Sequence, residues 1–149
     1  MASNTPKSAL KIVNALSPDD FSSTAPTSGQ CLNIDTSGFR WATFVVTVGN
    51  VTGTSIAARV QESSDNFVAD AAADVTGAAI PVWGGSDDNT TKSITIDLYQ
   101  SERYLKLAFT YASITASDVA AVCILSVARD SLDVGTAGIQ TNATGPFPV

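Results

Sequence analysis

Residues 104–111 read YLKLAFTY, a stretch in which apolar and polar side chains alternate. The alternation places Leu105, Leu107, Phe109 and Tyr111 on one face and Lys106 and Thr110 on the other, which is typical of a β strand with one buried face. The preceding segment Ser93–Leu98 (SITIDL) alternates in the same way. The two segments together predict amphipathic strands that cover a common core.

The segment Ala120–Ala128 (AAVCILSVA) is apolar on both faces. This pattern indicates a central strand, or a strand whose outer face is covered by a partner. A helix is the alternative, because Val119, Val122 and Cys123 are at helical spacing. Enrichment in Val, Ile and Cys favours the strand.

Further strand patterns precede these segments. Phe39–Val48 (FRWATFVVTV) is rich in aromatic and β-branched residues, and Ile56–Gln61 (IAARVQ) alternates after the turn formers at 49–53. The two segments are predicted to form a hairpin. Ala9–Leu16 (ALKIVNAL) fits either a strand or a short helical turn.

The middle of the chain is less regular. Phe67–Ala73 (FVADAAA) has helix propensity and predicts a short helix. Ala78–Trp83 (AAIPVW) predicts a brief strand, which Pro81 would restrict to the edge of a sheet. Gly84–Thr91 (GGSDDNTT) is typical of an exposed loop.

These elements predict an all-β fold, a single antiparallel β-sandwich of jelly-roll type. Roughly six to eight strands at spacings of about ten residues favour a sandwich over a parallel α/β sheet. Proline and glycine positions divide the chain further. We expect an N-terminal arm or edge segment at 1–29, the sandwich domain at 30–130, and an extended C-terminal arm at 131–149.

Charge and composition exclude several partners. Only 15% of the residues are charged, the net charge is −6, and the eight Lys and Arg residues are scattered. No basic patch is present to neutralise phosphates, so we expect no nucleic-acid binding. No run of eighteen apolar residues is present, so we expect no membrane span. Cys31 and Cys123 are predicted to be buried reduced thiols, with a disulfide as the minor alternative.

The residue types needed for common catalysis are missing. The chain contains no histidine, which removes the usual activation of serine and cysteine nucleophiles and zinc sites built on histidine. Its aspartates fall mostly in turns, and the minor alternative of a calcium site at Asp87, Asp88 and Asn89 lacks the EF-hand spacing. We therefore expect no enzyme activity, no catalytic residues, no metal and no cofactor.

Two places on the chain are candidate partner contacts. Trp83 lies beside two glycines and is predicted to be exposed, where it could stack on a sugar. The C-terminus offers an apolar anchor between two prolines. The candidate contact residues are Trp83, Pro146, Phe147, Pro148 and Val149.

The order of motifs over residues 56–129 resembles that of small β-sandwich virion proteins of tailed bacteriophages, especially capsid decoration (cement) proteins. The motifs are Gln61–Phe67 (QESSDNF), Asp74–Ala78 (DVTGA), Ile94–Leu98 (ITIDL), Arg103–Leu107 (RYLKL) and Val122–Arg129 (VCILSVAR). The resemblance implies a protein on the outer surface of an assembled capsid, where subunits meet. It also implies the major capsid protein as the partner and a homotrimer. Residues 1–11 are polar and have no signal-peptide core, so we expect assembly in the host cytoplasm.

Two other functions fit the same pattern. One is a structural component of the tail, neck or head fibre, which the sequence does not distinguish from a decoration protein. The other is a carbohydrate-binding module that uses Trp83 and the loop at 84–91.

Overall fold

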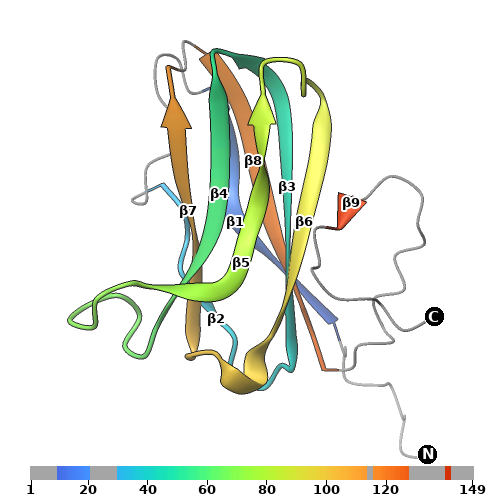
Figure 1. Cartoon of the computed structure of the whole chain (residues 1–149). Coiled ribbons are helices and arrows are strands. Elements are labelled where there is room, and N and C mark those ends of the chain that lie inside the picture. Colours follow the sequence, from blue (N-terminus) through green and yellow to red (C-terminus); the bar gives the residue numbers. More distant parts are fainter. Residues whose placement is uncertain (1–9, 21–29, 114–115, 128–139, 142–149) are drawn as a thin grey trace, which may run out of the picture.

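The fold is a sandwich of two β sheets, seen in a computed structural model (Figure 1). The structure describes residues 10–20, 30–113, 116–127 and 140–141. In these ranges the strands are β1 (Leu10–Asp20), β2 (Ile34–Asp35), β3 (Trp41–Thr52), β4 (Ser55–Ser63), β5 (Ala73–Gly84), β6 (Thr90–Asp97), β7 (Tyr104–Ala112), β8 (Ala116–Ser126) and β9 (Gln140–Thr141). One 3₁₀ turn, η1 (Leu98–Gln100), joins β6 to β7.

The strand order confirms the predicted antiparallel β-sandwich and its jelly-roll type. One sheet, sheet A, has the order β1-β8-β3-β6-β9, and the other, sheet B, has the order β2-β7-β4-β5. The first eight strands pair from the outside inwards, β1 with β8, β2 with β7, β3 with β6 and β4 with β5. This is the arrangement of one long hairpin rolled up, and rolling adds the pairs β3–β8 and β4–β7.

The predicted hairpin between the segments at 39–48 and 56–61 is wrong. The two segments form β3 and β4, which follow one another in the chain but belong to different sheets. The turn between them, with Gly53 at a φ of 146°, carries the chain from one sheet to the other. β3 instead pairs with β8 and β6 within sheet A. Its inward face packs in the core between the two sheets.

The predicted short helix at 67–73 is also wrong. Residues 64–70 form a loop held together by the carboxylate of Asp65. Its two oxygens accept the backbone N–H groups of Val68, Ala69 and Asp70 at 2.7–3.1 Å. These bonds satisfy backbone donors that a helix would otherwise use, which is how aspartate competes with helix formation. Asn66, with a φ of 65°, further bends the chain away from a helix.

Two other local predictions are confirmed, with longer bounds. The segment Ala78–Trp83 belongs to β5, which is an edge strand of sheet B as Pro81 indicated. The segment predicted as a strand or helical turn at 9–16 contributes to β1, an edge strand of sheet A. Of the predicted N-terminal segment 1–29, residues 10–20 supply an edge of the sandwich, and residues 1–9 and 21–29 lie outside the described part of the chain.

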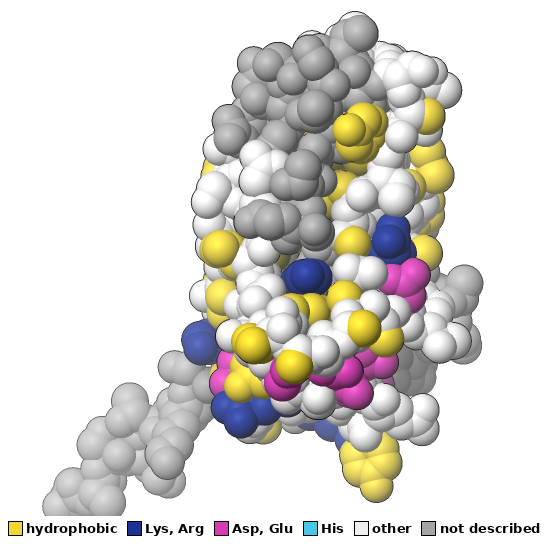
Figure 2. Space-filling view, turned by 90° about the vertical axis from the view of Figure 1, so that its left-hand side faces the viewer, with side chains coloured by type: hydrophobic (Ala, Val, Ile, Leu, Met, Phe, Trp, Pro, Cys, Tyr) yellow, Lys and Arg dark blue, Asp and Glu magenta, His cyan; other side chains and the backbone are white. Residues whose placement is uncertain are grey.

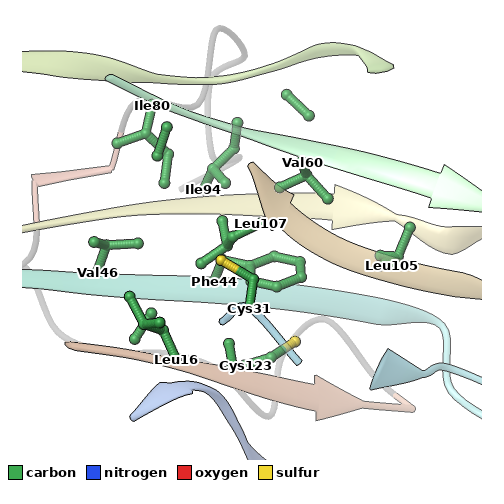
Figure 3. Packing of buried hydrophobic residues seen from close by; sticks show 14 of the residues in the cluster. Leu16, Cys31, Phe44, Val46, Val60, Ile80, Ile94, Leu105, Leu107 and Cys123 are labelled. Carbon is green, nitrogen blue, oxygen red and sulfur yellow. The ribbon is translucent and has the colours of Figure 1, made fainter. Parts of the chain in front are cut away.

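The core fills the layer between the two sheets (Figure 3). Alternate residues of each strand enter it, as in Phe44 and Val46 of β3 and Leu105 and Leu107 of β7, all with no exposed surface. The predicted inward face of residues 104–111 is confirmed for Leu105 and Leu107, and Phe109 is partly buried against the core, but Tyr111 is 47% exposed. No helix among the described residues is long and apolar enough to cross a membrane.

Both cysteines lie in this core as free thiols, which confirms the prediction of buried reduced cysteines. Cys123 is on the inward face of β8, and Cys31 is in the connection before β2. Burial raises the pKa of the Cys31 thiol to about 11 and that of Cys123 to about 12. Both side chains are therefore protonated near neutral pH and act as small apolar groups.

Candidate docking surface

The outward face of sheet A carries apolar side chains where a solvent-exposed sheet usually carries charges. The strand register shows which residues share this face, because directly opposed residues of antiparallel strands point the same way. Ile124 of β8 is opposite Ile12 of β1 and Thr43 of β3. Val122 of β8 is opposite Val45 of β3. The segment predicted to be apolar on both faces is therefore β8, with one face in the core and the other outside.

Several of these outward side chains are accessible. Ile12 is 64% exposed and Val122 is 37% exposed, while Val45 and Ile124 are half-buried. β8 is therefore not buried on both faces, because Val122 on its outward face is at the surface. Neighbouring exposed apolar residues on one face are a feature of surfaces that bind another molecule.

Threonines occupy the other side of the same face, along β3 and β6. The hydroxyl groups of Thr43 and Thr95 are 2.9 Å apart, and those of Thr47 and Thr91 are 3.0 Å apart. Each pair joins directly opposed residues of the two strands. The threonines hydrogen bond to each other across the strands, which keeps this part of the face uncharged and flat.

Charge on this face is confined to its two ends, among the side chains that the structure describes. Asp118 of β8 is at one end, and Arg40 with Asp97 is at the other. The Arg40 guanidinium donates to Asp97 at 2.9 Å and lies 4.8 Å from the ring centre of Tyr99 and 5.6 Å from that of Trp41. Tyr99 is 78% exposed, so this end presents an aromatic ring held by an arginine.

The outward face of sheet B has the opposite character. Asp74 of β5 accepts hydrogen bonds from Arg59 and Gln61 of β4, each at 2.8 Å. Lys106 of β7 lies over the ring of Phe67 at 4.1 Å. Figure 2, seen from the side of β7, shows acidic and basic side chains gathered together in the lower half of the molecule. This mixed charge is typical of a surface that faces water.

We define the docking face as the outward face of sheet A between its charged ends. Its members are Ile12, Asn14, Thr43, Val45, Thr47, Thr91, Ser93, Thr95, Ala120, Val122 and Ile124. Of these, the sequence indicated only the apolar outer face of the segment at 120–128. Ile12 was missed because its partner in the sheet, Ile124, lies at the other end of the domain in sequence.

The predicted exposure of Trp83 is wrong. Its side chain has no exposed surface, because β5 turns it into the core opposite Ile56. Lys92 of β6 covers it, with its amino group 5.0 Å from the ring centre and 2.8 Å from the carbonyl oxygen of Val82. In this position Trp83 cannot stack on a sugar. The other candidate contacts, Pro146, Phe147, Pro148 and Val149, lie outside the described residues.

The loop at 84–89 uses its carboxylates for structure. Asp87 accepts the backbone N–H of Gly84 at 2.9 Å, and Asp88 accepts that of Val51 at 2.8 Å. The bond from Gly84 and the nearby Lys92 lower the pKa of Asp87. Over the ranges that the structure describes, no three acidic or cysteine side chains are placed to hold a metal ion.

The comparisons with protein-family models and with curated proteins found no match to this chain.

Acidic side chains gather where the loop at 64–70 meets the segment before β7. The backbone N–H of Glu102 donates to the Glu62 carboxylate at 2.9 Å. Desolvation raises the pKa of the Glu102 carboxyl, and so do the nearby carboxylates of Asp70, Glu62 and Asp65. By linkage, a raised folded-state pKa means that stability falls as pH rises from the unfolded pKa of Glu through the folded one.

The variant Glu102→Gln is therefore expected to have a higher Tm than the parent at pH 7. The gain should disappear near pH 4, where the parent carboxyl is largely protonated. Asp74→Asn is the control of opposite sign, because hydrogen bonds from Gln61 and Arg59 lower the pKa of Asp74. That control should lower the Tm at pH 7. Thermal unfolding followed by circular dichroism measures both, and a lower Tm for Glu102→Gln at pH 7 would contradict the prediction.

Proposed function

We propose that this chain is a non-enzymatic structural protein that binds the outer surface of an assembled phage capsid through the docking face. In this role it stabilises the junctions between copies of the major capsid protein, as a decoration protein does. The observation that carries the proposal is the contrast between the two outward faces of the sandwich. Sheet A presents an uncharged surface with exposed Ile12 and Val122, whereas sheet B presents hydrogen-bonded ion pairs.

Two further points support this class of protein. The motif order over residues 56–129 resembles that of phage decoration proteins. The jelly-roll order of the strands is also a fold that viral capsid proteins use, although folds alone host many functions. Three copies around a local symmetry axis would place three docking faces on neighbouring capsid subunits, so we include a homotrimer in the proposal.

The test is binding to phage heads that lack the protein. The double variant Ile12→Lys, Val122→Lys places two charges in the docking face and is expected to weaken binding by about a hundredfold, because a charge without a partner must be desolvated there. The control is Thr110→Lys, Val68→Lys, which adds the same charge at exposed positions outside that face. Co-sedimentation with heads measures binding, and DNA release on heating measures stabilisation.

Three outcomes would count against the proposal. In the first, the parent chain does not bind heads. In the second, the docking-face variant binds as well as the parent. In the third, heads with and without the bound protein release DNA at the same temperature. Imaging of the complex separates the head from the other parts of the particle. Density on the tail or neck alone would make the chain a structural component there instead.

A further inference from the structure

The sandwich has a cleft along one open side, away from the centre of the docking face. β5 and β6 diverge towards the end of β6 that leads into η1 (Figure 1). A cleft of about 310 Å³ lies in this opening. Its walls are residues 75–78 of β5 and 94–97 of β6, and Glu62, Gln100 and Ser101 complete the lining.

Both walls of this cleft, the β5–β6 cleft, are edges of sheets. β5 pairs with β4 on one side only. β6 pairs with β3 on one side, and on its other side β9 reaches only Lys92 and Ser93. Residues 94–97 therefore have no strand on their outer side within the described ranges. Such an edge offers backbone N–H and C=O groups to an added strand, and β9 shows that an extended segment pairs with this edge.

The floor of the cleft is apolar. It is formed by Ile94 and Ile96 of β6 and Ala78 of β5, whose side chains are buried. A strand laid beside β6 would direct every second side chain towards this floor and the others towards water. Residues 94–97 span about 13 Å in extended conformation, which matches roughly four residues of an added strand. The cleft therefore has the shape and the hydrogen-bonding groups for an extended peptide.

The charge around the cleft is negative. Glu62 and Asp97 line it, and no lysine or arginine does. Asp97 is paired with Arg40, but none of the described cations forms an ion pair with Glu62. Glu102, whose backbone N–H donates to the Glu62 carboxylate, adds a further negative charge, and Asp70 interacts with the carboxyl of Glu102. A cationic side chain placed at Glu62 would relieve this repulsion.

We propose that the β5–β6 cleft binds an extended peptide segment of a partner protein, which pairs with residues 94–97 of β6 and places a lysine or arginine against Glu62. The binding mode is the addition of a strand to a free sheet edge. Backbone hydrogen bonds hold the segment, the apolar floor selects its alternate side chains, and Glu62 selects its charge. This site adjoins the docking face at Thr95. The peptide proposal does not depend on the proposed capsid role.

The probe is a synthetic peptide with blocked ends, of sequence TVTVTVK, titrated into the ¹⁵N-labelled full chain. Backbone amide signals of residues 75–78 and 94–97 are expected to shift in a saturable way. A matched peptide that ends in glutamate, TVTVTVE, should bind about fivefold more weakly, in line with one partly exposed ion pair. The lysine peptide with N-methyl groups on alternate residues should not bind, because it cannot donate those backbone hydrogen bonds.

Two variants of the protein locate the charge selection. Glu62→Gln should remove the difference between the lysine and glutamate peptides. Asp118→Asn removes the same charge at the far end of sheet A and should leave the difference intact. The proposal would be overturned if the parent chain bound both peptides with equal affinity, or if the N-methylated peptide bound as well as the unmethylated lysine peptide. Amide shifts only at residues away from the cleft would also overturn it. Shifts of the same amides with cellohexaose and with neither peptide would assign the cleft to a glycan instead.

Discussion

Replacing Phe44 with alanine is expected to lower the free energy of unfolding by about 3–5 kcal/mol, the usual cost of removing a buried aromatic ring. Phe44 is on β3, the middle strand of sheet A, and has no exposed surface. In the sheet it is opposite Cys123 on β8 and Ile94 on β6. Its ring points into the layer between the sheets, where Leu107 enters from sheet B (Figure 3). The other residues cannot close the space that the ring leaves, because strands on both sides hold β3 in place.

Urea denaturation followed by circular dichroism measures this loss. The matched control is Thr47→Ala on the same strand, whose side chain points outwards and bonds to Thr91. That control should change the free energy of unfolding by no more than about 0.5–1 kcal/mol. If Phe44→Ala cost less than about 1 kcal/mol, the ring would not be the centre of the core described above.

Trp83→Ala is expected to cost a similar amount, about 3–5 kcal/mol, since Trp83 is the largest fully buried side chain among the described residues. Trp83→Phe should cost much less, below about 2 kcal/mol. Its indole N–H is buried without a hydrogen-bond acceptor in the described structure, so replacing it removes an unsatisfied donor while most of the ring contacts remain. The ring of phenylalanine would still lie beneath the amino group of Lys92.

Fluorescence gives a second measurement at this position. The chain has two tryptophans, so Trp41→Phe leaves Trp83 as the only indole. We expect its emission at short wavelength and weak quenching by acrylamide in the folded state, with both changing on unfolding. Free quenching in the folded state would contradict its burial and would return Trp83 to the set of possible surface contacts.

The strands were the part of the fold most accessible from sequence, because alternation reflects which face of a strand is buried. Residues 93–98 and 104–109 alternate in sequence and place their larger apolar side chains against the core as predicted, whereas Tyr111 is exposed. The pairing of strands was less accessible. β3 and β4 have the sequence of a hairpin, yet which sheet each joins depends on the packing of the whole sandwich. Phe67–Ala73 has helix propensity, but Asp65 takes the backbone donors.

The candidate sites were mostly beyond sequence reasoning, for a related reason. Trp83 lies beside two glycines in a polar context, which suggests exposure, and only the fold places Lys92 over it. The docking face joins Ile12 to Ile124, and no local pattern connects those positions. The β5–β6 cleft exists because two strands separate at one end, which is a property of sheet twist and not of a motif.

The nested pairing of the strands has a consequence for how the domain is made. Leu10 in the first strand of the sandwich pairs with Ser126 in the eighth, so β1 has no partner until the ribosome has produced nearly all of the domain. Only the pair β4–β5 is close in sequence, and it lies in the middle of the chain. Domains whose contacts are mostly distant in sequence fold in milliseconds to seconds, not microseconds. During that time the apolar β8 is exposed on both faces, so the copies most at risk of aggregation are completed chains that have not yet folded.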